Sequence, residues 1–221
     1  MTVFVLCMFP IVLSLGFWQL SRAHYKEELE DQYFDQLAAT SQPPPLSAEG
    51  AAFRRVRLSG VYHPSEYVLI DNQTYEGRVG YVVLARFDAS DGRRFLINRG
   101  WVEAPADRAQ LPVVDAPADI VSVDGVVWPD LGELPLQTEV NVPNGWPKRL
   151  SDRAFARVAA LIPGVAPYEV RLDVGQPGVL VPAPQSHDFK AAMHRGYATQ
   201  WFGLSIVLGL GYLLYGFRRH V

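Results

Sequence analysis

The stretch that decides the fold stands at the start of the chain: VFVLCMFPIVLSLGFWQL, residues 3–20. It has no charged side chain, and at about 1.5 Å of rise per residue it forms a helix of about 27 Å, close to the thickness of the hydrocarbon core of a bilayer. A second apolar run, residues 197–217, is also long enough to span. The two runs predict a transmembrane helix at each end of the chain.

The distribution of charge supports two spans. All 23 acidic residues lie between Glu27 and Asp188, whereas residues 1–21 carry no charge. Residues 191–221 hold only three of the 20 basic residues, so the middle of the chain has a net charge of about −6 and the tail about +3. Ionised groups are costly near the centre of a bilayer, and such segregation is what two spans require.

A cleaved signal peptide is the alternative for the first run. That run has no basic n-region and exceeds the roughly 7–15 apolar residues of a signal-peptide core, so we favour an anchor. Arg218-Arg219-His220 follows the second run, and basic clusters of this kind stay cytoplasmic. We therefore expect a multi-pass protein of the inner (plasma) membrane, with both termini cytoplasmic and the central domain periplasmic.

The expected organisation has four parts. Residues 1–21 form the first transmembrane helix, residues 22–190 the extracytoplasmic domain, residues 191–217 the second transmembrane helix with its interfacial lead-in, and residues 218–221 a short cytoplasmic tail. The start of the domain, residues 22–40, is predicted to continue the first helix out of the membrane.

Short strands bounded by turn residues fill most of the central domain. They are predicted over residues 55–62, 66–71, 81–87, 93–102, 120–128 and 168–174. Asp71-Asn72-Gln73 is expected to be a loop, Ser90-Asp91-Gly92 a hairpin turn, and Ser151 the N-cap of a helix that ends near Leu161. Consecutive strands with short turns predict an α+β domain, mainly antiparallel, whose sheet curves toward an open barrel with one or two helices packed on it.

Three short patterns carry further information. The first is Gly16-Phe17-Trp18-Gln19-Leu20-Ser21-Arg22, the second Asn98-Arg99-Gly100-Trp101-Val102, and the third runs from His194 to Leu204. Each has an ordinary structural interpretation: an interfacial tryptophan with a snorkelling arginine, a β-bulge with a packed aromatic ring, and a histidine tolerated at a membrane edge. In the third, His194, Tyr197 and Trp201 share one helix face, which could pack a flat aromatic ligand and offer an imidazole to its metal.

Taken together, the patterns resemble those of the Surfeit locus protein 1 family, the assembly factors of cytochrome c oxidase. The resemblance covers nearly the whole chain. It consists of a Gly-x-Trp-Gln-x-x-Arg start, an Asp-Asn…Gly…Gly-Tyr-x-Val-Leu region, an Asn-Arg-Gly-Trp-Val core and a His-x-x-Tyr-Ala-x-x-Trp-Phe finish.

The resemblance implies a non-enzymatic maturation factor that binds haem a and hands it to the oxidase catalytic subunit. Other assembly factors and membrane lipid are further expected partners. Nucleic acid is not an expected partner. The implied cofactor-binding residues are His194, as ligand of the haem iron, with Tyr197, Trp201, Phe202, Trp18, Gln19 and Arg22. Ala192 stands where the family often has Asn, so this motif does not supply a polar residue that orients His194.

Several alternatives stay open. His24 lies just past the first span on the same side as His194, so the two could form a bis-histidine site, although a solvated histidine is the simpler interpretation. A two-span sensor or scaffold without haem is the alternative function. Copper insertion is not favoured, because the lone Cys7 and scattered methionines form no copper motif. No Gly-x-Ser-x-Gly, His-Glu-x-x-His or phosphate-binding glycine loop points to an enzyme.

Overall fold

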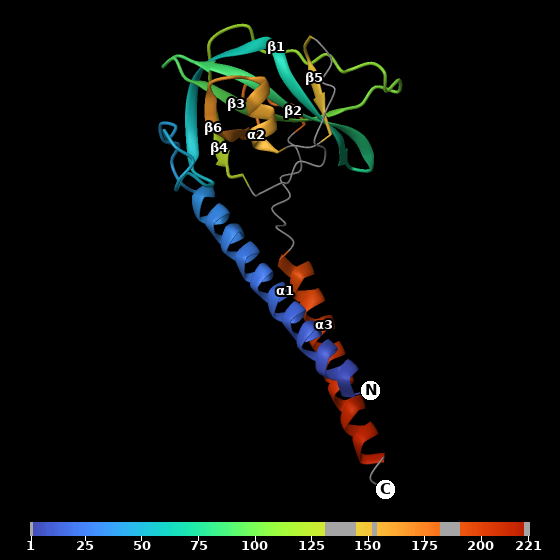
Figure 1. Ribbon diagram of the computed structural model, residues 1–221. Helices are drawn as coiled ribbons and strands as arrows, with labels where there is room; N and C mark the ends of the chain where they lie inside the picture. Colours follow the sequence, from blue (N-terminus) through green and yellow to red (C-terminus); the bar gives the residue numbers. More distant parts are fainter. Residues whose placement is uncertain (1, 131–144, 152–153, 182–190, 219–221) are drawn as a thin grey trace. The chain divides into compact units, whose positions relative to one another are not determined.

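The computed structural model describes residues 2–130, 145–151, 154–181 and 191–218 (Figure 1). Contacts within the chain divide it into two compact units, one made of Met1–Phe34 with Ser186–Val221 and the other of Asp35–Gln185. Residues 219–221 of the expected cytoplasmic tail lie outside the described residues.

Two long apolar helices make up the first unit: α1 (Thr2–Leu37) and α3 (Ala191–Arg218). Both are long and apolar enough to cross a membrane, as the two apolar runs predict. α1 does not end with its apolar run. It continues for about five further turns through charged residues, which confirms the predicted helical extension as far as Leu37.

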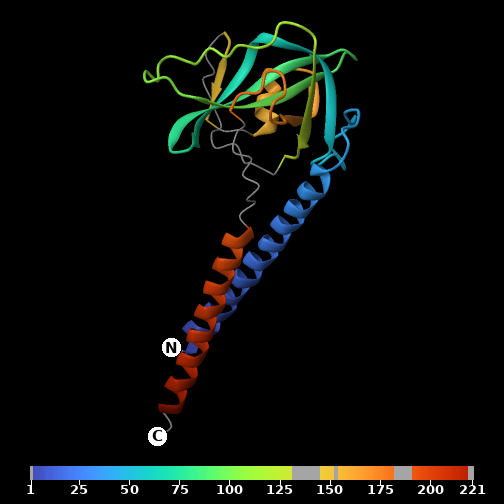
Figure 2. The ribbon, with the colours of Figure 1, turned by 180° about the vertical axis from the view of Figure 1, so that it is seen from behind.

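The second unit is a mostly antiparallel β domain, seen from two sides in Figures 1 and 2. Its strands are β1 (Arg55–Tyr75), β2 (Arg78–Ala89), β3 (Arg94–Glu103), β4 (Val121–Trp128), β5 (Lys148–Leu150) and β6 (Val165–Leu172). β1 pairs with both β2 and β4, and β3 and β6 complete the circuit, so the five longer strands close into a barrel. Closure leaves these strands without the free edges that would pair with other chains. The predicted class, an α+β and mainly antiparallel domain between two terminal apolar helices, is confirmed.

Two strand pairs are parallel, which the sequence pattern does not predict. β3 pairs with β6, and the short β5 pairs with β1. Parallel neighbours need a long crossover connection. The chain between β3 and β6 supplies one, and it contains β4, β5 and the helix α2 (Phe155–Leu161).

β1 is longer than predicted and contains two of the expected strands in one element of 21 residues. Asp71-Asn72-Gln73, predicted as a loop, is instead an irregularity within the strand, where Asn72 has φ 61° and the register with β2 shifts. The chain reverses at Glu76 and Gly77, both with positive φ, as a two-residue hairpin turn requires. The loop prediction was wrong because the residue types that favour turns also tolerate the left-handed backbone of a bulge.

The part of the sheet that packs against α2 is buried on both faces. Inside the barrel lies a core built from alternate residues of the five longer strands, including Leu69, Phe87 and Val170. Outside it, Val158 of α2 packs with Val68 in a second cluster. Successive strand residues point to opposite faces, so burial on both sides explains the unbroken apolar run in the middle of β1. Packing also explains the wrong prediction of Ser151 as N-cap: α2 begins at Phe155, after Ala154, without a side-chain cap.

The bulge expected near the end of β3 is present. Asn98 and Gly100 face consecutive residues of β2, so Arg99 is the extra residue between them. Arg99 is 2% exposed, and its guanidinium donates hydrogen bonds to the carbonyl oxygens of Gly178 and Asp115. It therefore fastens two loops to the barrel, and its burial lowers the pKa of its own guanidinium.

Two of the sequence motifs meet at Gly80. A Cβ atom there would lie 2.2 Å from the carbonyl oxygen of Val102 and 2.5 Å from Cε2 of the Trp101 ring. Trp101 Nε1 donates to the carbonyl oxygen of Gln73 at 2.8 Å, which holds the indole in place over the glycine. An aromatic ring packed over a glycine of the neighbouring strand is a known device for fixing strand register.

We expect Gly80→Val to lower the free energy of unfolding of the β domain by about 2 kcal/mol or more, because the new side chain meets a backbone carbonyl and an anchored ring. Urea unfolding of the full chain in detergent, followed by tryptophan fluorescence, measures this. Val79→Ala is the matched control, since Val79 is 43% exposed. An equal loss in both variants would contradict the close approach at Gly80.

Ionisation of Tyr62 should make the stability of the β domain fall at alkaline pH. Burial raises the pKa of its hydroxyl from 10.0 to about 12, against the opposing charge of Arg99. The neutral hydroxyl, which donates to the carbonyl oxygen of Pro177 at 2.9 Å, is thus favoured by folding. This contribution is fully present below pH 10 and is lost as the pH rises to about 12.

We expect Tyr62→Phe to remove about 2 to 3 kcal/mol of the loss in folding free energy between pH 9 and pH 12, since two pKa units correspond to that amount. Unfolding curves of the wild type and the variant across this range give the difference directly. Identical slopes for the two proteins would show that Tyr62 ionises as readily in the folded state as in the unfolded one.

Candidate functional site

The site begins with a hydrogen bond between the two apolar helices. His194, in the first turns of α3, places Nδ1 2.7 Å from Oε1 of Gln19 on α1. The two residues are 175 positions apart in sequence and belong to two different motifs. Both side chains are half-buried. The first and third sequence patterns therefore meet in one place.

This contact favours one tautomer of the His194 ring. The amide oxygen of Gln19 only accepts hydrogen bonds, so Nδ1 of His194 carries the proton and donates it. In a neutral imidazole the other nitrogen, Nε2, then keeps its lone pair. Ala192, which is exposed, cannot orient the ring, but Gln19 does so from the other helix. The sequence alone gave no reason to pair Gln19 with His194.

The aromatic residues of the motifs divide into two groups. Tyr197 and Trp201 follow His194 at three and seven positions along α3, and Tyr197 is 46% exposed. Trp18 is 57% exposed beside Gln19. Tyr197 and Trp201 share the face of α3 that carries His194, and the exposed rings of Tyr197 and Trp18 are accessible. Phe202, by contrast, contacts Phe17 edge to face, with ring centroids 5.2 Å apart.

Phe202 belongs to the packing of the two helices. A Cβ on Gly16 would lie 2.7 Å from Cε1 of Phe202, so the glycine makes room for the ring. Ala23 and Ala198 are also buried, at 1% and 3% exposure. Small residues allow helix backbones to approach closely in a membrane. Gly16 and Ala23 are seven residues apart, and so are Ala198 and the buried Ser205, a spacing from which this interface could have been predicted.

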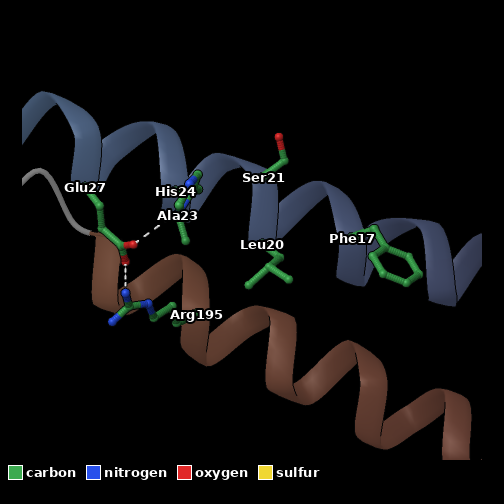
Figure 3. A pocket seen from close by; sticks show the side chains of 7 residues that line it. All are labelled: Phe17, Leu20, Ser21, Ala23, His24, Glu27 and Arg195. Carbon is green, nitrogen blue, oxygen red and sulfur yellow. Dashed lines mark ion pairs between the residues drawn. The ribbon is translucent and has the colours of Figure 1, made fainter.

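A second polar contact joins the helices on the other side of this interface. Arg195 of α3 forms an ion pair with Glu27 of α1, and His24 lies 3.7 Å from the same carboxylate (Figure 3). His24 also approaches Glu28, at 3.8 Å. Arg195, Glu27 and His24 border a pocket that His194 does not line. The structure therefore does not bring His24 and His194 together as a bis-histidine pair.

The remaining predicted residue, Arg22, is exposed on α1 one turn after Trp18 and lies 5.2 Å from the centre of the Tyr25 ring. Within residues 2–130, 145–151, 154–181 and 191–218 there is no group of three or more His, Cys, Asp or Glu side chains placed to hold a metal ion.

These features define a class of protein: it is membrane-associated, with an apolar helix at each end of the chain and, between them in sequence, a closed β domain. The chain belongs to the SURF1 family, whose model matches residues 6–206. Members of that family are cytochrome oxidase assembly factors.

Individual relatives agree with the family match. A SURF1-like protein of Rickettsia felis is 26% identical over 230 residues, covering 98% of this chain and 96% of the relative. An uncharacterized SURF1-like protein of Mycobacterium bovis is 29% identical over 211 residues, covering 90% and 76%. A SURF1-like protein of Dictyostelium discoideum is 31% identical over 121 residues, a match that covers 48% of this chain and 44% of that relative.

The contact between the two helices can be tested by cross-linking. In a Cys7→Ser background, we expect Gln19→Cys with His194→Cys to form a disulfide under mild oxidation, because their side chains touch. Ser21→Cys with His194→Cys is the matched control, since Ser21 lies about 200° further around α1. The fraction cross-linked is read from gel mobility with and without reductant. Equal yields for the two pairs would contradict the arrangement.

Proposed function

We propose that this chain assists the assembly of cytochrome c oxidase by binding haem a at the outer end of its helix pair and passing it to the catalytic subunit. The observation that carries the proposal is the 2.7 Å contact between His194 Nδ1 and Gln19 Oε1. It unites the two helix motifs and leaves Nε2 of His194 as a nitrogen ligand.

The residues present fit such a group. Haem supplies an iron that takes a neutral imidazole as axial ligand. A metal-bound histidine ordinarily donates its other N–H to a carbonyl or carboxylate oxygen, which fixes the tautomer and the ring orientation. Gln19 is that acceptor here. This contact supports a ring orientation of His194 that suits ligation.

The other motif residues have roles that suit a large, flat and partly acidic ligand. Tyr197, Trp201 and Trp18 offer aromatic surfaces on the same side of the helix pair as His194, and aromatic rings stack on flat π-systems. Arg22 offers an exposed cation for carboxylates. Phe202 contributes indirectly, through the packing at Gly16 that keeps the two helices close.

The site is open to its surroundings, which suits transfer better than storage. Trp18 and Tyr197 are about half exposed, so a partner subunit can reach a ligand held there. We place the β domain on the periplasmic side of the inner membrane, with both termini in the cytoplasm, from the basic cluster after the second span. The oxidase catalytic subunit is then the receiving partner, and the chain itself performs no catalysis.

The decisive experiment is expression of the full chain in a host that makes haem a, followed by absorption spectra and haem stoichiometry of the purified protein. We expect His194→Ala to lose most of the bound haem. We expect Gln19→Leu to retain less haem than the wild type, by roughly 10- to 100-fold in affinity, the usual effect of removing a partner that orients a ligand.

Gln19→Glu distinguishes the effect of the hydrogen bond on His194 from the effect of side-chain packing, because it keeps the shape of the side chain and adds a charge. A carboxylate acceptor makes the imidazole a stronger donor, so the reduction potential of bound haem should fall. His24→Ala is the control and should keep wild-type occupancy. A wild-type protein that purifies without haem, or a His194→Ala variant with an unchanged spectrum, would refute the proposal.

A further inference from the structure

The ion pair between Glu27 and Arg195 borders a pocket that the proposed haem site does not use. The pocket has a volume of about 490 Å³ and is lined by Phe17, Leu20, Ser21, Ala23, His24, Glu27 and Arg195. Figure 3 shows the two charged side chains at one end and Phe17 at the other, with all but Arg195 coming from α1. The lining is therefore apolar toward the first apolar run and polar toward the charged part of α1.

The side chains of the pocket separate it from the haem site. His194 and Arg195 are consecutive residues of one helix, so their side chains diverge by about 100° around α3. His194 contacts Gln19, whereas Arg195 contacts Glu27. Each residue thus belongs to a different side of the α1–α3 interface, and occupation of one side leaves the other free.

The depth of the pocket matches the headgroup region of a bilayer. Leu20 is the last residue of the first apolar run, and Glu27 follows seven residues later, about 10 Å along the helix. The polar layer on each side of the hydrocarbon core is several ångströms thick. Phe17 and Leu20 belong to the apolar run and lie at the level of acyl chains. Arg195 lies two residues before the second apolar run, at the level of headgroups, and Glu27 is its ion-pair partner.

The charges of the pocket favour a zwitterion. Glu27 and Arg195 are of opposite sign, and Glu28 adds a second carboxylate close to His24. A head with only negative charge would meet these carboxylates. A head with both a phosphate and an ammonium group can place each beside its opposite. A guanidinium has five N–H donors, and the Arg195 side chain is 62% exposed, so it can bind a phosphate while it stays paired with Glu27.

We propose that this pocket is a binding site for a phospholipid whose head carries a phosphate and a primary ammonium, as in phosphatidylethanolamine. Arg195 binds the phosphate and Glu27 accepts hydrogen bonds from the ammonium. The start of an acyl chain packs on Phe17 and Leu20. Glu27 gives the site its preference, because only an ammonium with N–H groups can donate to its carboxylate.

The test uses the full chain in nanodiscs of equal parts phosphatidylethanolamine, phosphatidylcholine and phosphatidylglycerol, followed by extraction and native mass spectrometry of the lipids that stay bound. Among the retained lipids, the ratio of phosphatidylethanolamine to phosphatidylcholine should rise from one to roughly five, the factor that one net hydrogen bond supplies. Glu27→Gln should abolish this preference over phosphatidylcholine, whose quaternary ammonium has no N–H to donate. Arg195→Gln should weaken retention of all three lipids, and Arg195→Lys should restore it.

Arg78→Gln and Glu103→Gln are the matched controls, because these two residues form an exposed ion pair of 2.8 Å within the β domain. Both should leave the lipid preference unchanged. Retention of the three lipids in their bulk ratio by the wild type would overturn the proposal, as would an equal loss in the controls. The haem spectrum is a separate readout, so the lipid site and the haem site can fail independently.

Discussion

The approach of α1 and α3 is the constraint on which the rest of the first unit depends. Hydrocarbon offers no hydrophobic force to drive two apolar helices together, so their association depends on close packing and on polar contacts. Gly16 supplies the space that the ring of Phe202 fills, and Ala23 and Ala198 are buried close by. Only at such short separation can the side chain of Gln19 reach His194, or that of Glu27 reach Arg195.

The close approach of α1 and α3 also gives their interface two sides with different chemistry. Consecutive residues on α3 face opposite sides, and each finds a different partner on α1. One side combines an oriented imidazole with exposed aromatic rings and the other combines an ion pair with an apolar floor. The interface between α1 and α3 thereby carries two distinct polar contacts, one on each side.

The β barrel is held together by contacts of a different kind from those between the helices. Its five longer strands close on themselves, Arg99 fastens two loops to it, and Trp101 packs over Gly80. These contacts account for two of the motifs as structural elements. Motif residues of this family therefore include both residues that hold the β domain together and residues that form the site between the helices.

Sequence reasoning recovered the parts governed by local pattern. Length and absence of charge predicted both apolar helices, and alternation with turn residues predicted the hairpin of β2 and β3 and the antiparallel character of the sheet. It failed where contacts between residues far apart in sequence determine the local structure. Asn72 favours a turn locally, yet pairing with β2 keeps it inside β1. Ser151 is a good cap locally, yet packing of Val158 starts α2 later.

The candidate site likewise combines residues that the sequence identifies with a contact that it does not predict. The motifs named Gln19 and His194 separately, but nothing local relates two residues that are 175 positions apart. The ion pair of Glu27 with Arg195 was missed for the same reason. The seven-residue spacing of Gly16 with Ala23, and of Ala198 with Ser205, was the one available signal that the helices meet along these faces.

That separation in sequence has a consequence for how the protein is made. Gln19 is synthesised near the beginning of the chain and His194 near the end of the described residues, so the oriented imidazole exists only after the whole β domain has been translated and the second apolar helix has joined the first. A partly synthesised chain presents neither half of the site in working form. The order of synthesis thus makes the contact between Gln19 and His194 a late one, formed only once both helices are present.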